Sequence, residues 1–182
     1  LKLVEDLLDV SRIVTGTMRL DMRAVDVEAV VTAALDSIRP AVAAKQIRLD
    51  VLLEAGGAMV LGAADRLQQV VWNLAMNAVK FTPAGGSIRV LVRAVDRELA
   101  IVVTDSGEGI EPDVLPFIFD RFRQGDSTST RAHGGLGIGL ALVRHMVELH
   151  GGTVRAESPG RGLGATFAVT LPRLVAKPGE GP

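Results

Sequence analysis

Hydrophobic residues recur every three or four positions over several stretches of the chain, and each such stretch predicts an amphipathic helix. The first helix is predicted to begin after Asp26, a favourable N-cap residue, and to run to about Ala44. Its apolar positions are Val27, Val30, Val31, Ala34, Leu35 and Ile38. Pro40 lies inside this pattern and predicts a kink or an earlier end, because proline lacks the N–H that a helix interior uses.

Two more helices are predicted further along the chain. The helix over residues 65–81 is expected to begin with a capping box, because Gln68 follows Asp65 at the required spacing. Its apolar face consists of Leu67, Val70, Val71, Leu74 and Ala78. The other helix covers residues 138–150 and is ended by the glycine pair at 151–152.

Strands are predicted where apolar and polar residues alternate. They cover residues 47–51, 87–95, 99–104, 154–157 and 165–171. Residues 96–98 are expected to form a hairpin turn, and the glycine-rich residues 160–164 a second one. Helices mixed with antiparallel hairpins predict an α+β fold, a two-layer sandwich in which a mixed, mostly antiparallel sheet packs on helices.

The first residues form a short helical seam. Leu3, Leu7, Val10 and Val14 follow coiled-coil spacing, and Gly16 supplies a stop. So short a seam is unstable alone, so its partner helix is expected to be missing or to belong to another chain. The alternative is a capping helix that folds back onto the domain. Because the helical pattern is already under way at the first residue, the chain is expected to be part of a longer protein.

Composition excludes several classes of function. The 182 residues carry a net charge of −1 and 3% aromatic residues, which argues against binding to nucleic acid. There is no cysteine, so disulfides, thiolate metal sites and a cysteine nucleophile are excluded, and a reducing, cytoplasmic location is expected. No apolar run is long enough to span a bilayer, so no direct membrane contact is expected, although a membrane anchor could lie upstream.

Three polar residues share one face of the predicted helix 65–81. Asn73, Asn77 and Lys80 lie at positions i, i+4 and i+7. Side-chain amides are possible Mg²⁺ ligands, and an ammonium can bind phosphate. This face therefore predicts part of a nucleotide site.

A second candidate site follows an apolar strand. Asp105 comes at its end, and Gly107 and Gly109 come directly after it. The carboxylate could accept a hydrogen bond from a ligand amine such as that of adenine, and the glycines would let the backbone approach a flat ring. Taken alone, an Asx turn at the strand end is the stronger interpretation.

A third candidate is the run Gly134-Gly135-Leu136-Gly137-Ile138-Gly139-Leu140, which leads into the helix at 138–150. A glycine-rich helix N-terminus offers free N–H groups and the positive end of the helix dipole, which bind phosphates. The spacing matches neither a P-loop nor the dinucleotide fingerprint. The aperiodic stretch before it, at about 117–137, predicts a functional loop.

Together these motifs closely resemble the ATP-binding catalytic domain of sensor histidine kinases. NLAMNAVKF resembles the N-box, DSGEG the first glycine box, FIFDRF the F-box, GGLGIGL the second glycine box, and GATFAVTLP the closing strand. The resemblance implies a Bergerat-type ATP-binding domain at residues 17–172, with a lid at about 117–137. It also implies that residues 1–16 end a second dimerisation helix, and residues 173–182 are expected to be a flexible tail.

The resemblance implies a role for individual residues. Asn77 would bind Mg²⁺, Lys80 would contact phosphate, and Asp105 would accept the adenine amino group with support from Thr166 through a water molecule. The remaining residues implied to line the nucleotide are Asn73, Gly107, Gly109, Ile110, Phe122, Gly135, Leu136, Gly137, Gly139 and Leu140.

The implied lid carries aromatic and basic residues. Phe119 and Phe122 would hold it against the core. Arg121, Arg123 and Arg131 could each neutralise γ-phosphate charge or remain solvated, and Arg123 is preferred because it follows Phe122 directly. His133, His145 and His150 are not expected to be phosphorylated, because the family's acceptor histidine lies in a His-Glu-x-x-Arg-like stretch that this sequence lacks.

Asn73 bears on the type of reaction. Hydrolysing relatives such as gyrase and the mismatch-repair ATPases carry a glutamate at the corresponding position, and that glutamate activates water. An amide cannot accept this proton, so poor ATP hydrolysis is expected, and catalysis would rest on positioning by Asn73, Lys80 and Arg123.

Three functions follow from these residues. The preferred one is the Mg·ATP-binding kinase domain of a two-component sensor histidine kinase, which phosphorylates a histidine outside these residues and so could act only in trans. Its implied partners are the upstream dimerisation and phosphoacceptor helices, in a homodimer, and the receiver domain of a response regulator. The alternatives are a gyrase- or mismatch-repair-like ATPase and a catalytically silent nucleotide-binding signalling module.

Overall fold

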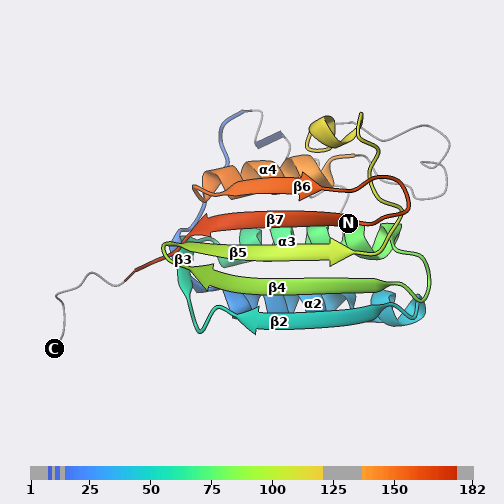
Figure 1. Cartoon of the computed structure of the whole chain (residues 1–182). Helices are drawn as coiled ribbons and strands as arrows, with labels where there is room; N and C mark the ends of the chain where they lie inside the picture. Colours follow the sequence, from blue (N-terminus) through green and yellow to red (C-terminus); the bar gives the residue numbers. More distant parts are fainter. Residues whose placement is uncertain (1–7, 10, 13–14, 121–136, 176–182) are drawn as a thin grey trace.

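The computed structural model describes residues 8–9, 11–12, 15–120 and 137–175 (Figure 1). The strands in these ranges are β1 (Arg23–Asp26), β2 (Arg48–Glu54), β3 (Met59–Gly62), β4 (Ser87–Val95), β5 (Glu98–Asp105), β6 (Thr153–Glu157) and β7 (Ala165–Pro172). The helices are α2 (Val27–Ala44), α3 (Ala64–Phe81), α4 (Gly139–Leu149) and a short 3₁₀ helix, η1 (Leu115–Phe117).

The main sheet has five strands in the order β2-β4-β5-β7-β6. Strands β2 and β4 are parallel, and the other neighbouring pairs are antiparallel. Helices α2, α3 and α4 lie side by side on one face of this sheet, behind the strands in Figure 1. Strands β1 and β3 form a separate antiparallel pair. The predicted α+β two-layer fold is therefore confirmed.

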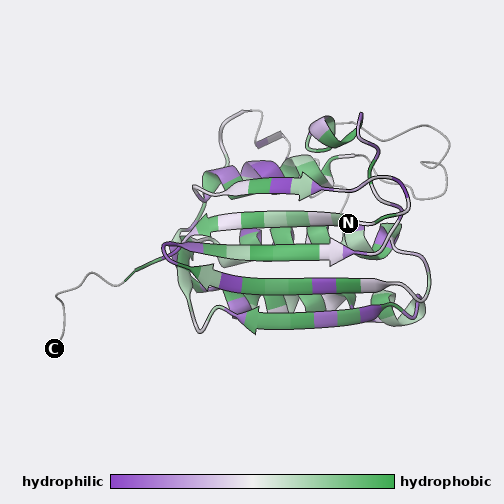
Figure 2. Ribbon diagram, viewed as in Figure 1, coloured by the Kyte–Doolittle hydropathy of each residue, from purple (hydrophilic) through white to green (hydrophobic). Residues whose placement is uncertain are grey.

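The core lies between the sheet and the helices. Every second residue of β5 and β7 is buried there, as are Ile88, Val90 and Val92 of β4, as the two-residue period of a strand requires. Hydrophobic residues dominate the strands in Figure 2. Leu74 at the centre of α3 is fully buried, and truncating such a leucine to alanine typically costs about 2–5 kcal/mol.

Helix α2 begins as predicted and continues past Pro40. The Asp26 carboxylate accepts hydrogen bonds from the N–H groups of Glu28 and Ala29. The predicted end at about Ala44 is confirmed, so the alternative of an earlier end at Pro40 is wrong. Ile38 and Val42, on either side of the proline, are both buried, and this packing holds the helix together across the missing hydrogen bond.

The predicted capping box of α3 is wrong. The N-cap residue is Ala63, which has no side chain to cap the helix, and Asp65 lies within the first turn. The Ala63 N–H donates instead to Nε2 of His150, at 3.0 Å, and Nδ1–H of His150 donates to the Met146 carbonyl. A buried histidine at the end of α4 thus replaces the expected local cap.

Sequence patterns missed β1 and β3, because four residues are too few to establish a period. Strand β2 begins one residue later than predicted and extends to Glu54. Beyond the predicted closing strand, Arg173 and Leu174 still donate backbone hydrogen bonds, to Arg97 and Met59. The structure therefore differs from the predicted tail at these two residues.

Candidate functional site

Helix α3 carries the predicted polar face. Asn73 is buried, and its Nδ2 has no hydrogen-bond partner among the described residues. Asn77 and Lys80 are half-buried on the same helix. A buried amide N–H without a partner is unfavourable, so this face suits a polar ligand.

Lys80 lies at the last turn of α3. Its Nζ is 4.9 Å from the centre of the Phe81 ring, a cation–π contact. Burial lowers the pKa of the Lys80 ammonium below its ordinary value of 10.5. An anionic phosphate placed here would oppose that effect and favour the charged form.

Asp105 is the last residue of β5, and its side chain points to the buried face of the sheet. Its Oδ1 accepts hydrogen bonds from the N–H groups of Gly107, at 2.8 Å, and Ala165, at 3.3 Å. The Asx turn is therefore present. Burial raises the pKa of the carboxyl above 3.8, and the two backbone hydrogen bonds act in the opposite direction. Because both bonds use Oδ1, the turn does not by itself occupy Oδ2.

The loop after Asp105 packs against the end of α3. The Glu108 N–H donates to the Phe81 carbonyl at 3.1 Å. A Cβ on Gly107 would lie 2.5 Å from that same carbonyl oxygen, so only glycine fits. This contact places the Asp105 loop next to Lys80.

The start of α4 lies beside Asn73. A Cβ built on Gly139 would be 3.8 Å from Asn73 Oδ1. Gly137 has φ +67°, and Ile138 is the N-cap residue, with no side-chain cap. The free N–H groups of α4 therefore begin beside the buried amide of α3. Leu140 follows in the first turn, while Gly135 and Leu136 lie outside the described residues.

The structure separates Thr166 from Asp105. Asp105 pairs with Ala165, whereas Thr166 pairs with Thr104, and their hydroxyls are 3.2 Å apart. Since successive residues of a strand point to opposite faces, the Thr166 side chain lies on the sheet face that the helices leave open. The predicted support of an adenine contact by Thr166 is therefore wrong by one position in register, and Ala165 there has no hydroxyl.

Most of the predicted lid lies outside the described residues. This applies to Arg121, Phe122, Arg123, Arg131 and His133. Phe119, just before that stretch, packs edge-on against Phe167 with ring centres 6.3 Å apart. The predicted contact of Phe119 with the core is confirmed.

Sequence patterns did not predict a contact between two turns that are distant in the chain. The Ser158 hydroxyl accepts from the Ile110 N–H at 2.9 Å and donates to the Gly164 carbonyl at 2.7 Å. The Gly164 N–H donates to the Gly107 carbonyl at 3.0 Å. The turn between β6 and β7 therefore holds the Asp105 loop in place. A single serine produces no periodic pattern in the sequence. Its role is visible only once the structure shows which backbone groups it bonds.

The described part of the helical stub contacts α3. The buried Asp9 carboxylate accepts hydrogen bonds from Arg66, at 2.7 Å, and from Gln69, at 3.2 Å. The predicted seam of Leu3, Leu7, Val10 and Val14 lies outside the described residues. The contact agrees with the alternative in which the stub packs on the domain.

The described residues contain neither a histidine- and carboxylate-rich metal site nor a membrane-spanning helix. No group of three or more His, Asp or Glu side chains there could enclose a metal ion. None of the described helices is both long enough and apolar enough to cross a bilayer.

Comparison with known proteins decides the family. Residues 62–175 match the family described as histidine kinase-, DNA gyrase B-, and HSP90-like ATPase. The chain belongs to this family. The matched range includes the α3 face, Asp105 and its loop, and the start of α4.

Several similar curated proteins are named histidine kinases. The chain is 38% identical over 177 residues to hybrid signal transduction histidine kinase D of Dictyostelium discoideum, covering 94% of this chain and 11% of that protein. It is 37% identical over 175 residues to the sensor-like histidine kinase SenX3 of Mycobacterium tuberculosis, covering 95% of this chain and 42% of SenX3. The chain thus spans less than half the length of these relatives.

Solved structures of the family have the same fold. The mycobacterial sensor histidine kinase MprB aligns with TM-score 0.75 and 28% identity, over 85% of this chain and 99% of that chain. Full-length ShkA in complex with AMPPNP aligns with TM-score 0.83 and 30% identity, over 96% of this chain and 36% of that chain.

Proposed function

We propose that residues 17–172 are the ATP-binding catalytic domain of a two-component sensor histidine kinase, and that residues 1–16 end its second dimerisation helix. The observation that carries the proposal is the meeting of three segments: the unpartnered buried amide of Asn73, the start of α4 beside it, and the Asp105 loop against the last turn of α3. The histidine kinases among the relatives support the same function.

ATP would lie between the Asp105 loop and the start of α4. The Asp105 carboxylate would accept the adenine amino group through Oδ2, since Oδ1 holds the turn, and Gly109 and Ile110 would line the base. The phosphates would extend toward Lys80 and the first N–H groups of α4, over Gly137, Gly139 and Leu140. The bound AMPPNP of the ShkA structure supports an adenine nucleotide as ligand.

The residues present fit a magnesium ion that is bound partly by the protein and partly by the phosphates of the nucleotide. Asn77 would bind it through Oδ1, since side-chain carbonyl oxygens are suitable ligands for this hard cation. Mg²⁺ ordinarily keeps waters and phosphate oxygens as its other ligands, so a single protein ligand is sufficient. When bound, the ion would neutralise phosphate charge.

The residues of this chain favour transfer to a protein over hydrolysis. Asn73 occupies the position of the catalytic glutamate in hydrolysing relatives, and its amide cannot take a proton from water. Its Nδ2–H, which has no partner among the described residues, would instead donate to a phosphate oxygen. Lys80 would hold the phosphate chain. From the family resemblance, Arg123 would neutralise γ-phosphate charge, and Phe122, Gly135 and Leu136 would line the nucleotide. Transfer then relies on positioning and charge neutralisation.

We propose that the acceptor is a histidine of the dimerisation helices, presented in a homodimer, and that the phosphoryl group passes on to the receiver domain of a response regulator. If residues 1–16 end such a helix, the Asp9 contact with Arg66 and Gln69 would be where it meets α3. The catalytically silent signalling module remains the alternative, and activity separates the two.

The test uses the full chain and a fluorescent ATP analogue. Asp105→Asn should weaken binding at least about tenfold, because an amide is a weaker acceptor than a carboxylate. Wild-type chain, [γ-³²P]ATP and the phosphoacceptor helix hairpin, supplied as a separate polypeptide, should yield acid-labile phosphate on the hairpin. Unchanged affinity in Asp105→Asn would refute the adenine contact, and strong binding without transfer would favour the silent module.

A further inference from the structure

The C-terminus of α3 does not end on a glycine cap. The helix ends at Phe81, Thr82 is extended, and Pro83 follows. Helices commonly end on a left-handed glycine whose N–H bonds back to the last carbonyls. Without it, the last four carbonyls of α3 need other donors.

Lys45, at least 34 residues away in the chain, supplies donors for two of these four carbonyls and for the Thr82 carbonyl that follows them. The ammonium Nζ of Lys45 donates to the carbonyls of Val79 at 2.8 Å, Lys80 at 3.0 Å and Thr82 at 2.8 Å. An ammonium has three N–H bonds, so this arrangement uses all of them. A cation at a helix C-terminus also interacts favourably with the helix dipole.

The two remaining carbonyls of the last turn are also satisfied. The Thr82 N–H donates to Ala78 at 2.9 Å, and the Glu108 N–H donates to Phe81 at 3.1 Å. The second of these bonds comes from the loop after Asp105. The end of α3 is therefore held by Lys45 on one side and joined to the Asp105 loop on the other.

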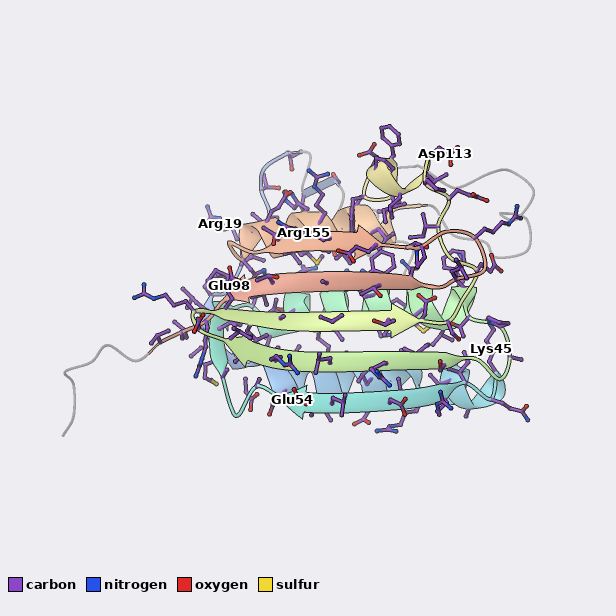
Figure 3. The ribbon with its side chains drawn as sticks, viewed as in Figure 1. Arg19, Lys45, Glu54, Glu98, Asp113 and Arg155 are labelled. Atoms are coloured by element: carbon purple, nitrogen blue, oxygen red, sulfur yellow. The ribbon has the colours of Figure 1, made fainter. Side chains whose placement is uncertain are left out.

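Lys45 is itself fixed by backbone bonds. It is the C-cap residue of α2, and the next residue, Gln46, has φ +52° and turns the chain toward β2. The Lys45 carbonyl accepts from the Gly85 N–H at 2.9 Å, beyond the end of α3. Figure 3 labels Lys45 at the end of the sheet toward which β5 points, the end where Asp105 lies.

We propose that Lys45 is a positioning residue for nucleotide binding. It does not contact the nucleotide itself but holds in place Lys80, the residue that contacts the phosphates. Its bond to the Lys80 carbonyl fixes the backbone from which the Lys80 side chain extends, and its bonds to Val79 and Thr82 prevent the last turn from fraying. The inference rests on the proposed function, because it takes Lys80 as the phosphate contact.

The experiment compares full-chain variants in equilibrium binding to ATP and to adenosine. Lys45→Met keeps the length of the side chain but leaves the carbonyls without donors, and it should weaken ATP binding about tenfold, the order expected when a contacting group is displaced. Adenosine affinity should change less than about twofold, because Lys80 serves the phosphates. Arg39→Met is the matched control: it removes an exposed cation from the same helix and should alter neither affinity.

A double-mutant cycle separates positioning from general destabilisation. If Lys45 acts through Lys80, Lys45→Met should weaken ATP binding of Lys80→Met by less than about twofold. An unchanged ATP affinity in Lys45→Met, equal losses for ATP and adenosine, or additive losses in the double variant would each overturn the proposal.

Two further measurements test the proposal if Lys45→Met does not fold. Lys45→Arg keeps the charge, but a planar guanidinium cannot direct three N–H groups to three converging carbonyls, so a smaller loss confined to ATP is expected. Faster hydrogen exchange at Thr82 and Glu108 in that variant should accompany it, and wild-type affinity with unchanged exchange would refute the inference. If the wild-type chain binds adenosine and ATP equally, or Asp105→Asn has no effect, the proposed function itself fails.

Discussion

The Asp105 carboxylate accepts a hydrogen bond from the Ala165 N–H, 3.3 Å away on the neighbouring strand β7. The same oxygen accepts from Gly107, so one side chain joins the end of β5, its loop and the start of β7. This position is buried, and burial raises the pKa of Asp105. The Asp105 carboxyl group therefore both joins these segments and has a raised pKa.

The raised pKa predicts how stability depends on pH. As the pH falls, the folded chain takes up the Asp105 proton before the unfolded chain does, so protonation favours folding. The free energy of unfolding of the wild type, relative to Asp105→Asn, should rise as the pH falls through the raised pKa and level off below 3.8, the ordinary value. Urea denaturation of both proteins between neutral and acidic pH measures this difference. A difference that is constant with pH, or that falls on acidification, would contradict the prediction.

Asn77 should control the effect of magnesium. Asn77→Ala removes the proposed ligand, so the gain in ATP affinity on adding Mg²⁺ should fall at least about tenfold, while affinity in EDTA stays close to that of the wild type. Titration of a fluorescent ATP analogue with and without Mg²⁺ tests this. Gln68→Ala, an exposed change on the same helix, should retain the full Mg²⁺ effect. Full retention in Asn77→Ala would remove it as the ligand.

Two glycines of one turn should differ in their tolerance of alanine. Gly162 and Gly164 both have left-handed φ angles, of +76° and +75°. A Cβ on Gly162 meets no described atom within 4 Å, whereas a Cβ on Gly164 would collide with the Asp105 carbonyl. Gly162→Ala should cost about 1 kcal/mol of stability from backbone strain, and Gly164→Ala about 2 kcal/mol more. Equal losses in thermal or urea unfolding would mean that the turn does not pack against the Asp105 loop.

His150, the C-cap residue of α4, should contribute more to stability than His145 within the same helix. His150→Ala leaves the buried Ala63 N–H without an acceptor at the start of α3, and about 1–3 kcal/mol should be lost. His145, half-buried on the same helix, is the matched control, and His145→Ala should cost clearly less. Urea denaturation of the two variants decides between them, and similar losses would show that the Ala63 contact is dispensable.

How far the site could be predicted depended on whether its signal was local. Asn73, Asn77 and Lys80 were recognisable because a helix places i, i+4 and i+7 on one face. Asp105 stood out because it ends an apolar strand before two glycines. Thr166 was misassigned because a strand alternates faces at every residue, so a shift of one position in register reverses the side-chain direction.

The sequence alone determined the elements whose patterns are long enough to read: the three α helices, most strands of the main sheet and the order of the nucleotide-binding motifs. The hydrophobic period of these elements, the N-cap at Asp26 and the glycines of the motifs are local signals, because each involves only a few neighbouring residues. Only the tertiary structure decided how α3 begins and ends, because its partners, His150 at one end and Lys45 at the other, are distant in the chain. A hydrogen bond between distant residues leaves no periodic trace, since its donor and acceptor meet only after the helices have packed on the sheet.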